Sequence, residues 1–424
     1  MSTAEQSLSR LNRLNNDYTI QNFIAQASSR YILLNTNESR DNFPAYSIQD
    51  DQLNILAFYY LEIACSLAEN NDFESARDGL ERGASILEYV NGAAVSDGAL
   101  NRYYTLIASL AYYVAFQYSK SFILINKIQE DTLVAQMVAK FLRRDFIALK
   151  NQVAQLMVDP SYDDENLAFE KDEVIGNRKV YERVIGSCLA GFINYFQTGQ
   201  TSFMEEARER LQLLKEIAEV NQEPSIWWVI RLLLLICEGF EISALWKVLP
   251  QYFATTRSLL TDYIYSLTFR QPKGIYELFI TQRKCLDQVL RSERGCVVSI
   301  PTSSGKTRIA ELAILDSLAK HAGKKVLYVA PFRSLAFEIE HTLQPVMEHL
   351  GKQLSHMYGG ALFSDLDEMI FEESDLIIAT PEKAKAILRG KSELASEIQL
   401  VIFDEGHLFG ANERLIANEI FFEE

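Results

Sequence analysis

The hydrophobic pattern of this chain changes near Gln271, and that change is the strongest constraint on its fold. Before it, apolar residues recur at helical spacing in one segment after another, with almost no period-2 alternation. After it, short β-branched runs alternate with helical stretches, which is typical of a parallel sheet covered by helices. We therefore predict an all-α region over residues 1–270 and an α/β region over residues 271–424.

The composition is that of a globular protein. The chain has 424 residues, of which 48% are hydrophobic and 23% charged, so it can bury sizeable cores. Its five cysteines are widely spaced and include no C-x-x-C pair, which argues against disulfides and zinc and indicates a cytoplasmic location. Residues 1–16 lack the apolar core of a secretory signal. The most apolar segment, residues 227–240, is interrupted by Arg231 and Glu238, so we expect no membrane span.

The all-α region contains a pattern that resembles a tetratricopeptide-like helix pair. Large and small residues alternate at the spacing of such a pair over residues 55–90, with a break at 69–72. The sequence Asn71-Asp72-Phe73 is echoed by Arg144-Asp145-Phe146 about two repeat lengths later, and residues 201–220 resemble another second helix. We predict an irregular helical-repeat array that serves as an interaction or regulatory region. A helical bundle without repeats is the alternative.

In the α/β region, apolar runs predict strands that are buried on both faces. We expect a doubly wound parallel sheet, whose loops at the carboxyl ends of the strands meet where α/β proteins bind ligands. The expected strands are residues 296–300, 325–330, 375–379 and 400–403, and the expected helices are residues 308–322, 334–350 and 381–388.

A phosphate-binding loop is predicted between the strand at 296–300 and the helix that follows. Residues 301–307 read Pro-Thr-Ser-Ser-Gly-Lys-Thr, and such a loop binds phosphates through backbone N–H groups and the helix N-terminus. We expect Lys306 to reach the β- and γ-phosphates of ATP and the Thr307 hydroxyl to bind Mg²⁺. The other nucleotide-binding residues expected in the loop are Thr302, Ser303, Ser304 and Gly305.

Two adjacent carboxylates, Asp404 and Glu405, follow the strand predicted at 400–403. Carboxylates at the end of a buried strand are costly unless a cation offsets their desolvation, and Mg²⁺ bound to ATP supplies one. We expect Asp404 to hold the metal through water and Glu405 to orient the attacking water. His407 completes the sequence Asp-Glu-Gly-His and is a further candidate catalytic residue. An exposed turn is the simpler interpretation of such a pair alone, but it rarely coincides with a phosphate loop.

These motifs resemble those of the superfamily 2 DExH-box helicases, and within them the Ski2-like group. Residues 301–311 are similar to motif I of that group, which also lacks the first glycine, and residues 404–407 are similar to motif II. Residues 330–336 are similar to motif Ia and residues 379–383 to motif Ib, both of which touch the tracked strand in the family. The resemblance implies a RecA-like lobe that hydrolyses ATP with Mg²⁺.

The resemblance also implies roles for single residues. Gln282 stands at the place of the glutamine that reads adenine. The nucleic-acid contacts implied by motifs Ia and Ib and by a glycine element between them are Pro331, Arg333, Gly359, Gly360, Thr380, Pro381 and Lys383.

The family resemblance covers residues 275–424, about one RecA-like lobe, and no counterpart of motif III or of the second lobe follows. The second lobe carries the arginine finger that stabilises the transition state, so we expect this chain alone to be weakly active or inactive. We interpret the chain as the N-terminal part of a longer, apparently truncated helicase. A natural truncated scaffold is the alternative.

A large helical extension upstream of such a lobe, with Trp227 and Trp228 near its end, is similar to helicase subunits of bacterial antiphage systems, the Hachiman type among them. This resemblance implies antiviral defence, a nuclease as protein partner, and single-stranded or partly duplex DNA rather than RNA as the tracked polymer. The net charge of −16 does not exclude such a polymer, because a motor can hold a strand with backbone amides and a few cations.

Two other functions are compatible with the sequence. One is an interaction scaffold whose nucleotide site is vestigial or regulatory, and the other is a P-loop signalling ATPase whose helices sense a ligand. The presence of Lys306, Thr307, Asp404 and Glu405 argues against a vestigial site, and motifs Ia and Ib have no role in a signalling ATPase.

Overall fold

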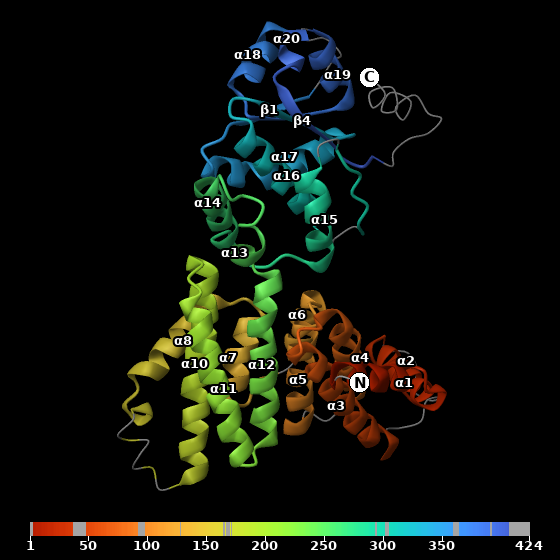
Figure 1. Ribbon diagram of the computed structural model, residues 1–424, viewed down its shortest axis with the longest axis vertical. Coiled ribbons are helices and arrows are strands. Elements are labelled where there is room, and N and C mark those ends of the chain that lie inside the picture. The colour runs from red at the N-terminus through yellow and green to blue at the C-terminus, as the bar shows by residue number, and fades with distance from the viewer. Residues whose placement is uncertain are drawn as a thin grey trace. The chain divides into compact units, whose positions relative to one another are not determined.

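The computed structural model describes residues 3–36, 48–91, 98–127, 129–163, 166, 170, 172–292, 295–301, 305–358, 364–390 and 392–406. It divides the chain into two compact units, Met1–Ile242 and Ser243–Glu424 (Figure 1). The first is helical and the second contains a parallel sheet, which confirms the predicted fold class.

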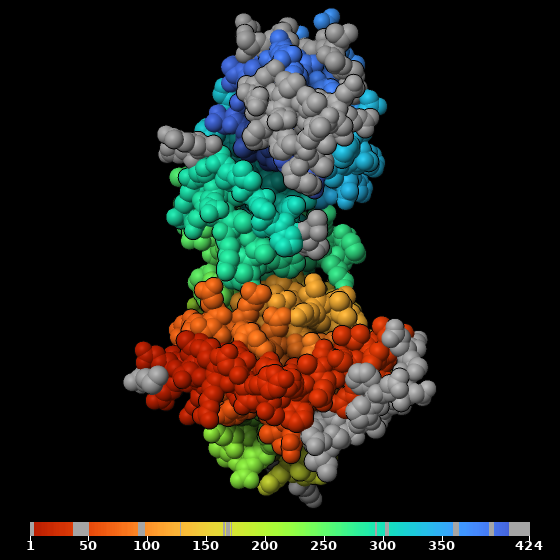
Figure 2. All heavy atoms as spheres, turned by 90° about the vertical axis from the view of Figure 1, so that its right-hand side faces the viewer, coloured from red at the N-terminus to blue at the C-terminus, as the bar shows by residue number. Residues whose placement is uncertain are grey.

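The N-terminal unit consists of helices joined mostly by short turns, as far as its residues are described. Figure 2 shows the first of these helices, in red and orange, as a continuous surface of this unit. The helices are α1 (Thr3–Asn15), α2 (Tyr18–Asn35), α3 (Ile48–Glu69), α4 (Phe73–Asn91), α5 (Ala99–Val114), α6 (Tyr118–Ile125), α7 (Leu133–Leu142), α8 (Phe146–Val158), the 3₁₀ turn η2 (Pro160–Tyr162), α10 (Glu173–Thr198), α11 (Ser202–Val220) and α12 (Pro224–Ser243).

One turn geometry recurs between these helices and explains the echo in the sequence. Asn71 and Arg144 both have a positive φ, of 63° and 58°. The next residue, Asp72 or Asp145, donates its N–H to a carbonyl five residues back, a bond of the Schellman type that ends a helix. The aspartate side chain then caps the following helix. The same backbone pattern occurs at Phe116 and Gln222, although no Asp-Phe sequence follows these two residues.

Helices α3 and α4 pack closely because small residues lie between them. A Cβ atom added at Gly83 would lie 2.8 Å from Cδ2 of Leu61 and 3.0 Å from the carbonyl oxygen of Ala57. The pair lies where the sequence predicts it, with a break after Glu69.

A buried arginine connects α12 to α3. Arg231 donates from Nε to Oε1 of Glu69 at 2.8 Å and from Nη2 to Oε2 at 3.0 Å, and it also pairs with Glu62. Its guanidinium lies 5.0 and 5.5 Å from the ring centroids of Trp227 and Trp228. The apolar segment of α12 therefore packs into the helical unit. Among the described helices, none combines the length and apolar character that crossing a membrane requires.

The C-terminal unit is organised around a four-stranded parallel sheet with the order β2-β3-β1-β4. Val329 at the end of β1 lies opposite Ala379 of β3 and Phe403 of β4, and Met357 of β2 lies opposite Ala379. All four strands therefore end at the same edge. Their bounds are β1 (Lys325–Val329), β2 (Leu354–Met357), β3 (Leu376–Ala379) and β4 (Ile398–Phe403).

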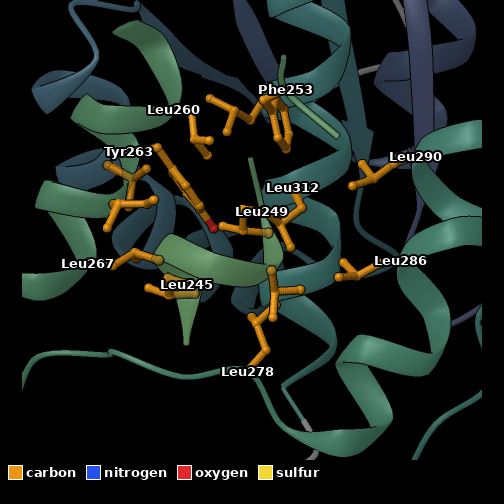
Figure 3. Close-up of a cluster of buried hydrophobic side chains, with 14 residues drawn as sticks. Leu245, Leu249, Phe253, Leu260, Tyr263, Leu267, Leu278, Leu286, Leu290 and Leu312 are labelled. Carbon is orange, nitrogen blue, oxygen red and sulfur yellow. The ribbon is translucent and has the colours of Figure 1, made fainter. Parts of the chain in front are cut away.

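Helices cover both faces of this sheet. One face packs against α16 and α17, and the other against α18, α19 and α20. A further layer of helices, α13, α14 and α15, packs on α16 and α17 from outside (Figure 3). The bounds are α13 (Leu245–Val248), α14 (Arg257–Thr268), α15 (Ile280–Arg291), α16 (Lys306–Lys320), α17 (Arg333–His349), α18 (Asp365–Glu373), α19 (Pro381–Gly390) and α20 (Ser392–Ala395).

Two details of the sheet differ from the sequence prediction. Residues 296–300, predicted as a strand, pair with none of the described strands, and Val297 is 88% exposed. A strand needs hydrogen-bonded neighbours, which an apolar run does not by itself provide. Conversely, β2 was not predicted, because this short edge strand carries two polar residues and shows no apolar run.

The boundary between the two units also lies earlier than predicted. We expected it between residues 270 and 271, but the second unit begins at Ser243. The reason is visible in Figure 3, where Leu245 of α13 and Leu260 of α14 share one buried cluster with Leu286 of α15 and Leu312 of α16. The last helices of the predicted all-α region are therefore part of the α/β lobe.

This boundary can be tested by truncation. A chain that begins at Ser243 is expected to unfold cooperatively, whereas one that begins at Gln271 loses α13 and α14 and exposes Leu286 and Leu312. Exposing a buried leucine costs about 1.5–3 kcal/mol, so the shorter chain should aggregate or melt without a sharp transition. Circular dichroism melts and size-exclusion chromatography at equal concentration distinguish the two. A monomeric, cooperative chain from Gln271 would restore the boundary predicted from the sequence.

Candidate functional site

Helix α16 begins directly after Gly305, whose backbone needs a glycine. Its φ of 76° lies in the left-handed region, and a Cβ atom here would lie 2.2 Å from Nε2 of Gln282. Gln282 donates from Nε2 to the carbonyl oxygen of Gly305 at 3.2 Å and accepts the N–H of Phe279 at 2.9 Å. The buried Gln282 thus ties the start of α15 to the loop before α16. Thr302, Ser303 and Ser304 lie outside the described residues.

Lys306 and Thr307 form the first turn of α16 and are half-buried. Backbone N–H groups in the first turn of a helix have no intrahelical partner, and the helix dipole adds partial positive charge there. In the part of the chain that is described, no carboxylate pairs with Lys306. This helix end therefore offers both backbone donors and an unneutralised ammonium group to an anion.

Asp404 follows β4 at the carboxyl edge of the sheet. Its N–H donates to the carbonyl oxygen of Val329 at 2.9 Å, so the pairing with β1 continues one residue past the strand. Its Oδ2 accepts the Tyr328 hydroxyl at 3.0 Å, and its Oδ1 accepts the N–H of Glu405 at 2.8 Å. Burial, and then the Asp404 charge, raise the pKa of Tyr328, which keeps this hydroxyl protonated as a donor. The Asp404 carboxylate is consequently held in one orientation.

The chain turns sharply after Asp404. Glu405 is half-buried and has a φ of 50°, which costs a non-glycine residue about 1–2 kcal/mol. Backbone strain of this kind is concentrated at functional sites. His407, the third candidate of this segment, lies outside the described residues.

Tyr328 orients one half of the site, because its hydroxyl contacts Asp404. Helix α16 packs on the same sheet through Ile314 and Leu318 and ends just before β1 begins, so its first turn lies toward the edge where the strands end. Sequence analysis did not identify Tyr328; the available signal was a tyrosine inside an otherwise apolar strand, whose hydroxyl needs a buried partner.

The residues of motifs Ia and Ib follow β1 and β3 at this same edge of the sheet. Pro331 lies between β1 and α17, and Arg333 begins α17 with an exposed side chain that pairs with no carboxylate in the described part of the chain. Thr380 follows β3 and is buried, and its carbonyl oxygen accepts the N–H of Ala384 at 2.8 Å. Pro381 begins α19. Gly359 and Gly360 lie outside the described residues.

Lys383 does not lie at the surface, where a contact with a nucleic-acid strand would place it. It is 6% exposed, and its Nζ donates to Oδ2 of Asp367 at 2.7 Å. Burial alone would raise the pKa of Asp367, but the hydrogen bonds from Lys383 and Ser364 hold it below its ordinary value. This ion pair joins α18 to α19. Sequence analysis could not predict this ion pair, because the two residues come from different helices.

Comparison with known proteins identifies the lobe. Residues 280–420 match the family of DEAD/DEAH box helicases. The chain is 38% identical over 97% of its length to the Hachiman protein HamB of Bacillus cereus, of which it covers 36%. It is 35% identical over 142 residues to the ATP-dependent DNA helicase Hel308 of Pyrococcus abyssi, a match that covers 34% of this chain and 19% of that helicase.

The chain thus spans about a third of the length of HamB and about a fifth of that of Hel308. The Hel308 match covers only a third of this chain, whereas the HamB match covers nearly all of it and so includes both units. Both agree with the Ski2-like and Hachiman-type resemblances inferred from the sequence. The chain therefore carries a DEAD/DEAH box helicase domain, preceded by a helical unit similar to that part of HamB.

Proposed function

We propose that this chain is the nucleotide-binding part of an ATP-dependent nucleic-acid translocase or helicase. The observation that carries the proposal is an oriented Asp404 at the carboxyl edge of a parallel sheet, together with a helix that packs on this sheet and begins with Lys306, which has no carboxylate partner in the described part of the chain. Motifs Ia and Ib follow β1 and β3 at the same edge. A binding site for a nucleotide and a path for a strand are therefore adjacent in one lobe.

The residues present fit ATP with its magnesium ion. Gly305 leaves no room for a side chain, as a loop that wraps phosphates requires, and Lys306 supplies a cation without a carboxylate partner. The Thr307 hydroxyl and the Asp404 carboxylate are oxygen ligands of the type that Mg²⁺ prefers. When bound, Mg²⁺ and ATP supply the phosphoryl group and the charge that offsets the carboxylates. Glu405 would hold a water by its carboxylate and accept its proton.

A scaffold with a vestigial nucleotide site is the alternative function. It is disfavoured because Asp404 is held in one orientation by the Tyr328 hydroxyl, while Lys306 has no carboxylate partner in the described part of the chain.

For the whole protein we propose a role in a Hachiman-type defence system in the cytoplasm. The similarity to HamB over both units supports this role. We further propose that the helical unit docks a partner effector, in line with a nuclease, while the lobe tracks DNA rather than RNA, as the match to a DNA helicase suggests.

The nucleotide site is tested by Lys306→Ala. Removing the ammonium group takes away a charge-assisted contact to phosphate, so affinity for Mg²⁺·ATP is expected to fall about tenfold or more. Isothermal calorimetry measures the affinity, and a thermal melt should show an unchanged midpoint. Lys324→Ala is the matched control, because Lys324 precedes β1 at the opposite edge of the sheet. Equal affinities of Lys306→Ala and the parent would contradict the site.

The role of Glu405 requires turnover, so Glu405→Gln is made in a chain of the full length of the relatives. The amide keeps the shape of the side chain but cannot accept a proton from water. Binding of Mg²⁺·ATP should be retained while nucleic-acid-stimulated hydrolysis falls by about 10²-fold or more, measured as phosphate release. Undiminished turnover would show that another group positions the water.

The strand path is tested by Arg333→Ala. Fluorescence anisotropy on single-stranded oligonucleotides is expected to show a similar loss of affinity for all sequences, because phosphate contacts carry no sequence information. The slope of log K against log salt should decrease in magnitude by about 0.7, the value for one phosphate of a single strand. Lys324→Ala again serves as control. If Arg333→Ala loses affinity for only one sequence, or loses no affinity at low salt, the nucleic-acid strand does not follow this surface.

A further inference from the structure

A buried group of charged and polar residues lies directly behind the phosphate loop. Arg308, next to Thr307, is 8% exposed and forms an ion pair with Glu311, which is 3% exposed. The hydroxyl of Tyr263, in α14, donates to Oε2 of Glu311 at 3.1 Å. We call Tyr263, Arg308 and Glu311 the Tyr263 cluster. Arg308 and Glu311 lie in the segment 301–311 that is similar to motif I, but none of the three residues is among those proposed to contact the nucleotide.

The Glu311 carboxylate depends on these two partners. Burial raises its pKa, while Arg308 and the Tyr263 hydroxyl act in the opposite direction. Its other oxygen, Oε1, has no hydrogen-bond partner within the described part of the chain. A buried carboxylate with one unsatisfied oxygen is sensitive to the loss of any partner, because few groups offset its desolvation, here Arg308, Tyr263 and the charge of Arg270.

The cluster joins two layers of the lobe. Tyr263 precedes the helicase domain at residues 280–420, and its ring points into the apolar cluster shown in Figure 3. Its hydroxyl reaches the turn of α16 that follows Lys306 and Thr307. The cluster is therefore next to the half of the nucleotide site that α16 provides.

Apolar contacts already hold α16 in place, through Leu312 and Leu315. Such contacts hold the helix between two apolar layers but do not by themselves orient a polar side chain such as Glu311. Hydrogen bonds are directional, and a buried ion pair contributes little net stability compared with apolar residues of similar size. The Tyr263 cluster is therefore better explained by a requirement for orientation than by one for stability.

We propose that Tyr263, Arg308 and Glu311 are positioning residues that fix the first turn of α16, so that Lys306 and Thr307 are presented to the phosphates in one orientation. The inference rests on the proposed nucleotide site. If it is correct, α14, which lies outside the helicase domain, affects nucleotide affinity through its contact with α16.

The first test is Tyr263→Phe in the full chain, which removes one hydroxyl and keeps the ring in its apolar surroundings. We expect the affinity for Mg²⁺·ATP, by calorimetry, to fall about two- to tenfold, because binding must then order side chains that the cluster no longer holds. Tyr252→Phe is the matched control, because it removes a hydroxyl that donates to Asp287 of α15 at 3.0 Å, away from α16. This control should bind as the parent does.

The second test separates orientation from stability. Arg308→Met removes the charge beside Glu311 and should weaken nucleotide binding, whereas Arg308→Lys keeps the charge and should recover most of the affinity. Affinities are measured well below the melting temperature of each variant, so that all molecules are folded. A merely structural role predicts lower melting temperatures with the affinity of the parent in both variants and in Tyr263→Phe.

Lys306→Ala, measured in the same series, distinguishes a failure of the positioning role from a failure of the nucleotide site. If Lys306→Ala loses affinity while Tyr263→Phe and Arg308→Met bind like the parent, the positioning role is wrong and the nucleotide site stands. If Lys306→Ala also binds like the parent, the nucleotide site is wrong and the positioning role falls with it.

Discussion

The register of the parallel sheet is the constraint on which the site depends. Because Val329, Ala379 and Phe403 lie opposite one another, the three loops that follow them must leave the sheet together. Segments separated by many residues in the sequence, such as those around Arg333 and Asp404, thereby become neighbours without any direct contact having to attract them. Shifting any strand by one residue would move its loop and also turn its apolar side chains to the opposite face.

Charge is distributed over this edge in a definite way. Lys306 has no carboxylate partner among the described residues, while Asp404 is oriented by a neutral tyrosine hydroxyl rather than by a cation. By contrast, Arg308 and Lys383 are buried in ion pairs with Glu311 and Asp367. Arg308 and Lys383 thus hold helices in place, whereas Lys306 and Asp404 remain to meet a charged ligand.

The sequence predicted those features that are encoded locally. The apolar runs of β1, β3 and β4 and the Gly-Lys-Thr start of α16 carry their own signals, so their placement was correct to within a few residues. Features that depend on distant partners were not predictable. Residues 296–300 have the composition of a strand but no described neighbour, β2 is a strand only because β3 lies beside it, and Lys383 is buried because Asp367 reaches it.

The boundary at Ser243 assigns α13 and α14 to the lobe rather than to the helical unit. Helix α14 has the amphipathic pattern of the helices before it, and its sequence alone does not reveal that its apolar face packs on α16. Because Tyr263 of α14 is bonded to Glu311, a rotation or shift of that helix changes the surroundings of the first turn of α16. In an α/β lobe whose functional groups sit at helix and strand ends, a layer that holds the helices is part of the site's geometry, even where it touches no ligand.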